Sequence, residues 1–395
     1  MSIFDATDDL FVNDDIFGKH TKRQDKAFKP WHKPRKQYIR DKQWADSLLR
    51  LLNDSKYKNI DTIKYFGLPG GDLLDVNYIH KRFNGSDRAK NKTLGVYGFI
   101  KDNEDFQKAQ GELSKLLDKE KIANNSNIVQ FCFEDIYNRK SDAISRIQNY
   151  GTYHFINLDF CDNVLTNDTL SALFTLIRYQ LDRVAGIPWL LCITTRLNRE
   201  SSNIDLIEKL QTIVNELGNI QDTNDKLDAL YKEVHKHIKS STKISEIDDK
   251  ALINQLLQIG FVLWVIKEAN TRKHKVELKS TFKYSVNLYD REQDMHSFVF
   301  RLQQPESSSV DTLGLVKTKG EAKPIILPSY SDAACETIEK LSKTHDVDDY
   351  FDGNKLELQK YAEQMKELLD ECGYDTANYY EEMKSLGYIF ADEVA

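Results

Sequence analysis

Three glycines and an aspartate lie close together at Gly67, Gly70, Gly71 and Asp72. An apolar run (60–66) precedes them and an amphipathic stretch (72–82) follows, so the pattern predicts a strand, a glycine turn and a helix N-terminus. Glycine lets the backbone approach a ligand closely, and the free N–H groups of a helix N-terminus point at it. The expected chemistry is binding of a nucleotide-like cofactor. A plain tight turn capped by Asp72 is the alternative.

A second group of chemically able side chains follows a later apolar run, at Asn157, Asp159 and Phe160. An amide can accept a hydrogen bond from an amine, an aromatic ring can stack on a base, and a desolvated carboxylate can take up a proton. The carboxylate is equally compatible with a loop at the edge of a parallel sheet or with a cation ligand. Asp135 ends another apolar run, where it can contact a ligand or form a turn.

Basic residues are concentrated near the N-terminus, although the formal net charge of the chain is −7. Residues 19–42 hold ten Lys or Arg against two Asp, whereas residues 339–395 hold fifteen Asp or Glu against six Lys. Two prolines in 29–40 and the absence of helical periodicity predict an extended arm. Cations interleaved with aromatic rings are typical of nucleic-acid binding, which predicts contacts with nucleic acid or an acidic partner protein at Lys33, Arg35, Lys36 and Arg40. A solvated arm, or one paired with the chain's own acidic end, is the alternative.

The elements that must position these residues alternate along the chain. Five strands separated by helices predict an α/β fold with a doubly wound, mostly parallel Rossmann-like sheet. A helical insertion at about 201–268 and a β-hairpin follow. The predicted strands cover 61–66, 93–100, 127–133, 153–158 and 188–195, and the hairpin covers 281–289 and 296–303. The expected domains are an arm (1–43), an α/β domain (44–304), a linker (305–332) and a small acidic helical segment (333–395).

Composition excludes several classes of protein. The five cysteines have no C-x-x-C spacing, and the histidines have no metal-ligand spacing, so no metal site is expected. No apolar run approaches the roughly 18 residues needed to span a bilayer, and the first residues have no signal-peptide pattern. We therefore expect a soluble, cytoplasmic protein that does not contact a membrane.

The order of five β-α units, a helix and a terminal hairpin over 60–304 resembles that of class I S-adenosylmethionine-dependent methyltransferases. The glycine motif of that family falls on 67–71, although Tyr65 and Phe66 replace the acidic residue that usually ends the first strand. Ile100 stands where the family carries the acid that holds the ribose. The Asn/Asp-Pro-Pro-Tyr/Phe tetrad of members that methylate amino groups falls on 157–160, with Leu158 and Asp159 in place of both prolines.

This resemblance implies a site for S-adenosylmethionine and a second site for its target. The cofactor would contact Gly67, Gly70, Gly71, Asp72 and Asp135, and the target would face Asn157, Asp159 and Phe160. The chain is similar to methyltransferase-fold proteins of bacterial restriction or phage-defence gene clusters, with nucleic acid as the expected target or partner. A catalytically inactive scaffold subunit of a hetero-complex is the alternative, because both strand acids and both prolines are missing. A Rossmann-like protein for another nucleotide is a third hypothesis.

Overall fold

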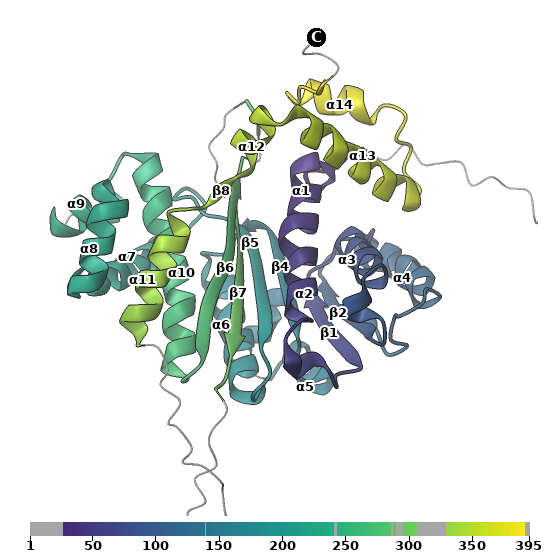
Figure 1. Cartoon of the computed structure of the whole chain (residues 1–395), viewed down its shortest axis with the longest axis horizontal. Helices are drawn as coiled ribbons and strands as arrows, with labels where there is room; N and C mark the ends of the chain where they lie inside the picture. Colours follow the sequence, from purple (N-terminus) through teal and green to yellow (C-terminus); the bar gives the residue numbers. More distant parts are fainter. Residues whose placement is uncertain are drawn as a thin grey trace, which may run out of the picture.

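An eight-stranded mixed sheet runs through the middle of the computed structural model (Figure 1). The structure describes residues 27–138, 140–240, 243–285, 287–289, 295–305 and 329–391. The strand order is β3-β2-β1-β4-β5-β7-β6-β8. The strands are β1 (Thr62–Gly67), β2 (Thr93–Ile100), β3 (Asn127–Gln130), β4 (Phe155–Asn163), β5 (Trp189–Arg196), β6 (Lys275–Tyr284), β7 (Met295–Gln303) and β8 (His345–Asp346).

The strand directions confirm the predicted doubly wound sheet with a C-terminal hairpin. The strands β1 to β5 pair in parallel with one another, whereas β7 is antiparallel to both β5 and β6. The short β8 adds to β6 in parallel. β4 continues to Asn163, past the predicted end at Leu158, because its pairing with β5 resumes after an irregularity between Asp159 and Asn163. The parallel strands end at one edge of the sheet, where α/β proteins bind their ligands.

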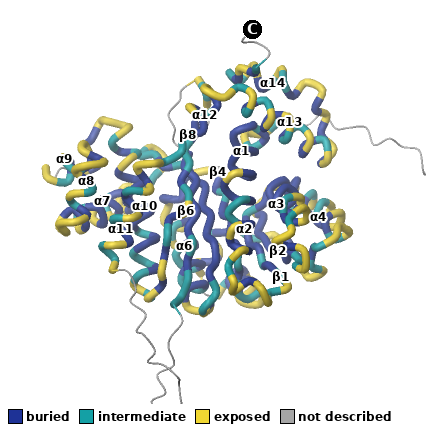
Figure 2. Tube along the Cα trace, in the orientation of Figure 1, coloured by how far each residue is buried: buried dark blue, intermediate teal, exposed yellow. Residues whose placement is uncertain are grey.

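Helices cover both faces of the sheet, and each face carries its own apolar core. The first face packs against α2 (Asp46–Leu51), α3 (Leu74–Asn84) and α4 (Asn103–Leu117). The second packs against α5 (Asp142–Tyr150), α6 (Asn167–Arg183) and α10 (Lys250–Thr271). Outside this second layer lie α7 (Ile204–Gly218), α8 (Gln221–Leu230) and α9 (Lys232–Ser240), in the stretch predicted to be a helical insertion. Figure 2 shows the buried strands between helices whose outer faces are exposed.

The helix α10 is long and apolar enough, by length and composition, to cross a membrane. However, 61% of its apolar window is buried inside the protein, where the helix packs on α7, α11 and β6. Buried core helices meet the same criterion of length and composition, and α10 lies in the core of this fold.

The described part of the N-terminal segment is helical from Pro34, which corrects the predicted extended arm there, and residues 1–26 lie outside the described residues. The helix α1 (Pro34–Ile39) passes into a π-helical stretch (Arg40–Ala45) and then into α2 without a break. Pro34 occupies the first position of α1, where a missing N–H costs nothing. Ile39 and Trp44 are fully buried, and this segment packs against α3 and α13. The prolines therefore mark the beginning of a helix.

The C-terminal segment passes from the second helical layer to the N-terminal helix. The helix α11 (Tyr330–Leu341) packs on α8 and α10, and β8 then joins the edge of the sheet. The helices α12 (Val347–Gly353), α13 (Lys355–Glu371) and α14 (Tyr379–Ser385) follow, and α13 lies beside α1 (Figure 1). Most of the predicted linker, at 306–328, lies outside the described residues.

Candidate functional site

A cavity of about 560 Å³ opens at the carboxyl edge of the sheet, beside the ends of β1, β2 and β4; we call it the edge cavity. Its apolar lining includes Leu68, Phe99, Ile100, Phe131, Phe133 and Phe160. Its carboxylates are Asp72, Asp75, Asp102, Asp105, Glu134, Asp159 and Asp162, and its cations are Arg40 and Lys101. The edge cavity therefore combines flat apolar walls with an excess of negative charge.

The three glycines of the turn have different roles. Gly70 lines the edge cavity, and a Cβ built on it would meet nothing within 4 Å. A Cβ on Gly71 would lie 2.7 Å from Oδ1 of Asp105, and one on Gly67 would collide with the ring of Tyr65. Gly67 and Gly71 are thus required by packing, and of the three only Gly70 faces the edge cavity.

Asp72 lines the edge cavity but does not cap the following helix. The N-cap of α3 is Leu73, which adopts the left-handed conformation (φ 48°) and makes no side-chain cap. The Asp72 carboxylate accepts hydrogen bonds from the Tyr374 hydroxyl and forms an ion pair with Lys108, both at 2.5 Å. The alternative of a turn capped by Asp72 is therefore wrong, and Asp72 joins the glycine turn to α4 and to the C-terminal segment.

Glu134, rather than the predicted Asp135, lines the edge cavity after β3. Asp135 is exposed in a short 3₁₀ turn. The Glu134 carboxylate accepts hydrogen bonds from Thr169 Oγ1 (2.9 Å) and Cys132 Sγ (2.6 Å). Although burial opposes it, hydrogen bonding, first from Cys132, lowers the pKa of Glu134 below its ordinary value. Successive residues of a 3₁₀ turn point about 120° apart, and here Glu134 rather than Asp135 faces the edge cavity. The sequence pattern did not indicate that turn.

Of the three residues predicted to face the target, Asp159 and Phe160 line a cavity, whereas Asn157 does not. Asp159 and Phe160 line the edge cavity and also a smaller neighbouring cavity of about 170 Å³, which we call the side cavity. Asn157 is 1% exposed, lines neither cavity, and donates a long hydrogen bond (3.5 Å) to the Tyr65 hydroxyl. Because β4 extends to Asn163, position 157 lies inside the sheet, short of its carboxyl edge.

Three of the four residues predicted to bind nucleic acid are buried in ion pairs within the protein. Arg35 binds Asp348 (2.7 Å), Arg40 Nε binds Asp75 (2.5 Å), and Lys36 Nζ binds Asp159. The side chains of Arg35 and Arg40 are 3% and 1% exposed. Lys33 is half-buried at the side cavity. The contact of Arg35 with Asp348 agrees with the alternative that the arm pairs with the chain's own acidic end.

The Lys36–Asp159 ion pair lies where the edge cavity and the side cavity meet. Burial raises the pKa of the Asp159 carboxyl, while the Lys36 ammonium opposes that rise. Burial disfavours the Lys36 ammonium, but Asp159 beside it raises the pKa of Lys36 above its ordinary value. Lys36 therefore keeps its proton at neutral pH, and its Nζ also lies 4.8 Å from the centre of the Trp44 ring.

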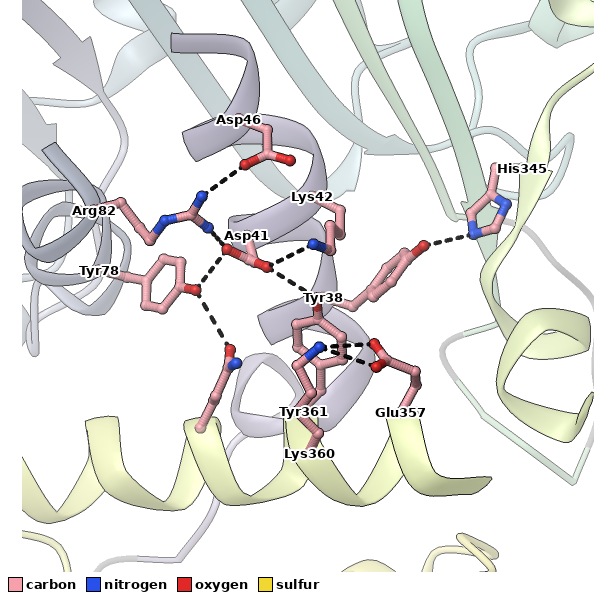
Figure 3. A network of polar contacts seen from close by, with 11 residues as sticks. Tyr38, Asp41, Lys42, Asp46, Tyr78, Arg82, His345, Glu357, Lys360 and Tyr361 are labelled. Atoms are coloured by element: carbon pink, nitrogen blue, oxygen red, sulfur yellow. Dashed lines mark hydrogen bonds and ion pairs between the residues drawn. The ribbon is translucent and has the colours of Figure 1, made fainter. Parts of the chain in front are cut away.

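A polar network around Asp41 fixes the N-terminal helix that carries Lys36 and Arg40 (Figure 3). Asp41 accepts hydrogen bonds from the hydroxyls of Tyr78 (2.8 Å) and Tyr361 (2.9 Å) and forms an ion pair with Arg82. These partners come from α3 and α13, so one buried carboxylate joins three helices. The network holds the helical wall of the edge cavity against the β-α core.

Sequence reasoning missed several residues of the site. Trp31, in the short 3₁₀ turn before α1, and Arg40 line the edge cavity, whereas the sequence pattern predicts an extended arm for this segment. Asp75 was missed although its spacing from Asp72 places both near the start of α3. No group of three or more His, Cys, Asp or Glu in the described ranges is arranged to hold a metal ion.

The sheet order, with β7 antiparallel between β5 and β6, and a cavity beside the glycine turn define a protein of the methyltransferase fold. The family model described as PP_RS20740-like matches residues 25–384, so the chain belongs to the PP_RS20740-like family. A search of curated proteins gives no significant match.

Several solved methyltransferases are similar to the chain at low identity. TrmN from Thermus thermophilus is 10% identical with a TM-score of 0.29; the match covers 66% of this chain but about half (48%) of TrmN. The methyltransferase domain of bacterial CtHen1-C is 12% identical with a TM-score of 0.32, covering 66% of this chain and 96% of that one. Loganic acid methyltransferase with SAH is 9% identical with a TM-score of 0.33, covering 72% and 99%. The methyltransferase fold follows from the strand order rather than from these likenesses.

Proposed function

We propose that the edge cavity binds S-adenosylmethionine and that the protein is a methyltransferase. The observation that supports this most directly is a cavity of about 560 Å³ that lies at the carboxyl edge of a doubly wound sheet and is open at Gly70. Its volume is within the range of about 300–1,000 Å³ that small-molecule sites occupy.

The residues of the edge cavity fit the parts of this cofactor. Phe131 and Phe133 provide flat apolar surfaces for an adenine ring. Seven lining carboxylates against two cations favour a ligand with a positively charged sulfonium and amine. Asp102 lines the edge cavity after β2 and can reach a ribose hydroxyl, although one of its oxygens already accepts the backbone N–H of Asp105 (3.0 Å).

The side cavity suits the methyl acceptor, because it shares Trp31, Asp159 and Phe160 with the edge cavity. Bound S-adenosylmethionine would supply an electrophilic methyl group. Asp159 would accept the proton that an N–H or O–H acceptor loses, Lys36 would hold the carboxylate in place, and Phe160 would exclude water. Asn157 has no part in this mechanism, since it lies behind the cavity wall.

Calorimetric titration with S-adenosylhomocysteine tests the cofactor site. We expect one binding site, lost in Gly70→Leu because the new side chain projects into the edge cavity. Gly111→Leu is the matched control, since Gly111 is an exposed glycine of α4 whose added Cβ also meets nothing within 4 Å. Absence of binding to the wild-type protein, or equal binding by both variants, would overturn the proposal.

A catalytically inactive subunit is the second candidate function. It is favoured by the burial of Asn157 and by the pairing of Asp159 with Lys36, which weakens the carboxylate as a base. This candidate predicts that S-adenosylhomocysteine binds but that no methyl group from labelled S-adenosylmethionine reaches host RNA, DNA or protein. It also predicts a stable partner in pull-downs from the host, and recovery of a solitary monomer would contradict it.

Nucleic acid is the acceptor or partner class that we propose for either candidate. The support is the excess of Lys and Arg in residues 19–42. Within this segment, Lys33 borders the side cavity, and residues before 27 lie outside the described part of the chain. Arg35, Lys36 and Arg40 are buried and therefore lie outside this contact surface. A cytoplasmic location, a hetero-complex and a role in phage defence remain predictions. Gel-shift titration with DNA and RNA, comparing wild type with Lys33→Ala, tests the partner class: equal, salt-insensitive affinities would contradict it.

A further inference from the structure

A third cavity, of about 600 Å³, lies on the face of the sheet that packs against α10; we call it the α10 cavity. Its walls come from the α8–α9 junction, the first half of α10 and the turn after α11, and β6 and β7 contribute Lys283 and His296. Met295, the residue before His296, lines the side cavity. Because neighbouring residues of a strand point to opposite faces, the α10 cavity is separate from the proposed methyl-transfer site.

His296 is the feature of the α10 cavity that packing alone does not explain. It is 3% exposed, and neither of its ring nitrogens has a hydrogen-bond partner within the described residues. Burial, with a smaller contribution from Lys283, lowers the pKa of His296 to about 3, so the ring is neutral at neutral pH. A neutral imidazole has one donor and one acceptor, and leaving both buried without a hydrogen-bond partner is unfavourable.

The remaining lining of the α10 cavity is mainly polar and includes three side-chain amide groups. The first half of α10 contributes Asn254, Gln255 and Gln258, and Gln258 is oriented by a hydrogen bond from its Nε2 to Thr344 Oγ1 (3.2 Å). Two lysines, Lys232 and Lys283, stand against a single carboxylate, Glu233, and Lys283 forms an ion pair with Asp346 (3.3 Å). Tyr231 and Leu341 are buried and provide apolar surface.

We propose that the α10 cavity is a second ligand site, which binds a mononucleotide. Carboxamide side chains pair with the donor and acceptor edge of a base, as Asn and Gln do with adenine, and His296 adds one donor and one acceptor. A base can stack on Tyr231, and Lys232 at the exposed rim can bind the phosphate as a point charge. The proposal does not depend on the proposed methyltransferase function, because the two sites share no lining residue.

The test is calorimetric titration of the full-length protein with AMP, adenosine and inorganic phosphate. We expect one AMP site in the wild type and in Gly70→Leu, whose edge cavity is blocked. His296→Leu should weaken AMP and adenosine alike by about tenfold or more, whereas His296→Gln, which keeps a donor and an acceptor, should weaken them less. Lys232→Ala should weaken AMP but leave adenosine unchanged, because it removes only the phosphate contact.

Three results would overturn the proposal. The first is no heat from AMP at millimolar concentration. The second is AMP binding that disappears in Gly70→Leu but persists in His296→Leu, which would place AMP in the edge cavity. The third is a His296→Leu protein that unfolds at a higher temperature and binds AMP as before, which would make His296 a packing residue. If His296→Leu does not fold, Asn254→Ala at a half-exposed position takes its place, and unchanged AMP affinity would count against the proposal in the same way.

Discussion

The edge cavity has two walls that are built in different ways. The wall from the β-α core consists of a glycine turn and aromatic side chains, and its shape follows from backbone geometry and apolar packing. The wall from the N-terminal helix is held by buried ion pairs, of which Arg40 with Asp75 and Lys36 with Asp159 reach the cavity. The first wall belongs to the fold, whereas the second depends on a few charged contacts between segments far apart in the sequence. The helical wall should therefore be far more sensitive to single charge changes.

Arg40→Met should have the largest effect on stability. The substitution keeps most of the apolar stem but leaves the Asp75 carboxylate buried without its partner, so we expect a loss of about 3–5 kcal/mol in the free energy of unfolding. Urea denaturation measures it. Arg50→Met, at an exposed position of α2, is the control and should change stability by less than about 0.5 kcal/mol. Equal losses in the two variants would mean that the ion pair does not hold this wall.

Asp159→Asn should cost less, about 2–3 kcal/mol, because the asparagine carbonyl can still accept a hydrogen bond from the Lys36 ammonium that loses its counter-ion. Asp162→Asn is the matched control, since Asp162 lines the edge cavity but is exposed. Denaturation curves for both variants provide the comparison. If Asp159→Asn were as stable as the wild type, the Lys36–Asp159 pair would be dispensable to the helical wall.

Acid should weaken the same wall through His32. Burial, and then Arg40, lower the pKa of His32 from 6.5 to about 3, so the unfolded chain binds a proton that the folded chain excludes. The stability linked to His32 is therefore complete above pH 6.5 and is lost as the pH falls toward 3. The expected loss at pH 5 is roughly 2 kcal/mol. His32→Gln should show a smaller decline in unfolding free energy between pH 7.5 and pH 5, and an unchanged decline would contradict the assignment.

Lys81→Ala should have the smallest effect, about 0.5 kcal/mol or less. Lys81 in α3 pairs with Glu371 in α13 at 3.0 Å, but the two side chains are 54% and 50% exposed. The pair joins α3 and α13, two of the three helices that Asp41 joins, so this variant separates the effect of a charge contact from the effect of burial. Thermal unfolding at low and high salt measures it. A loss comparable to that of Arg40→Met would remove the distinction between buried and exposed pairs.

The β-α core could be predicted from the sequence because its signals are local. Alternating apolar runs and helices predicted β1, β2 and β5 to within one residue, and the glycines marked the turn that lines the edge cavity. The first hairpin strand, predicted at 281–289, instead covers Lys275–Tyr284 as β6. The predicted end of β4 was too early, because pairing with β5 extends the strand to Asn163. The residue pattern within β4 alone cannot indicate this pairing. Asp159 and Phe160 were placed correctly beside the cavity, but Asn157 was not.

The N-terminal helix could not be predicted because its buried side chains look like surface residues. Arginine and lysine side chains are normally solvated. Burial of Arg35, Lys36 and Arg40 is possible because each forms an ion pair, with Asp348, Asp159 and Asp75 respectively. Two of these partners lie more than 100 residues away in the sequence, so no window of sequence contains the pair. Composition identified the charge of the segment correctly but not its environment.

The tyrosines of the C-terminal segment have a consequence for the order in which the protein is made. Tyr361 donates to Asp41, Tyr379 donates to the backbone carbonyl of His32, and Tyr388 accepts from Arg35, so the first described helix is held by some of the last described residues. During synthesis, the β-α core can fold as soon as β7 has left the ribosome. The helical wall can dock fully only after Tyr388 has left the ribosome as well. A polypeptide that stops before residue 361 would contain the glycine turn but lack the supports that complete the edge cavity, so premature termination is expected to yield a sheet without a binding site.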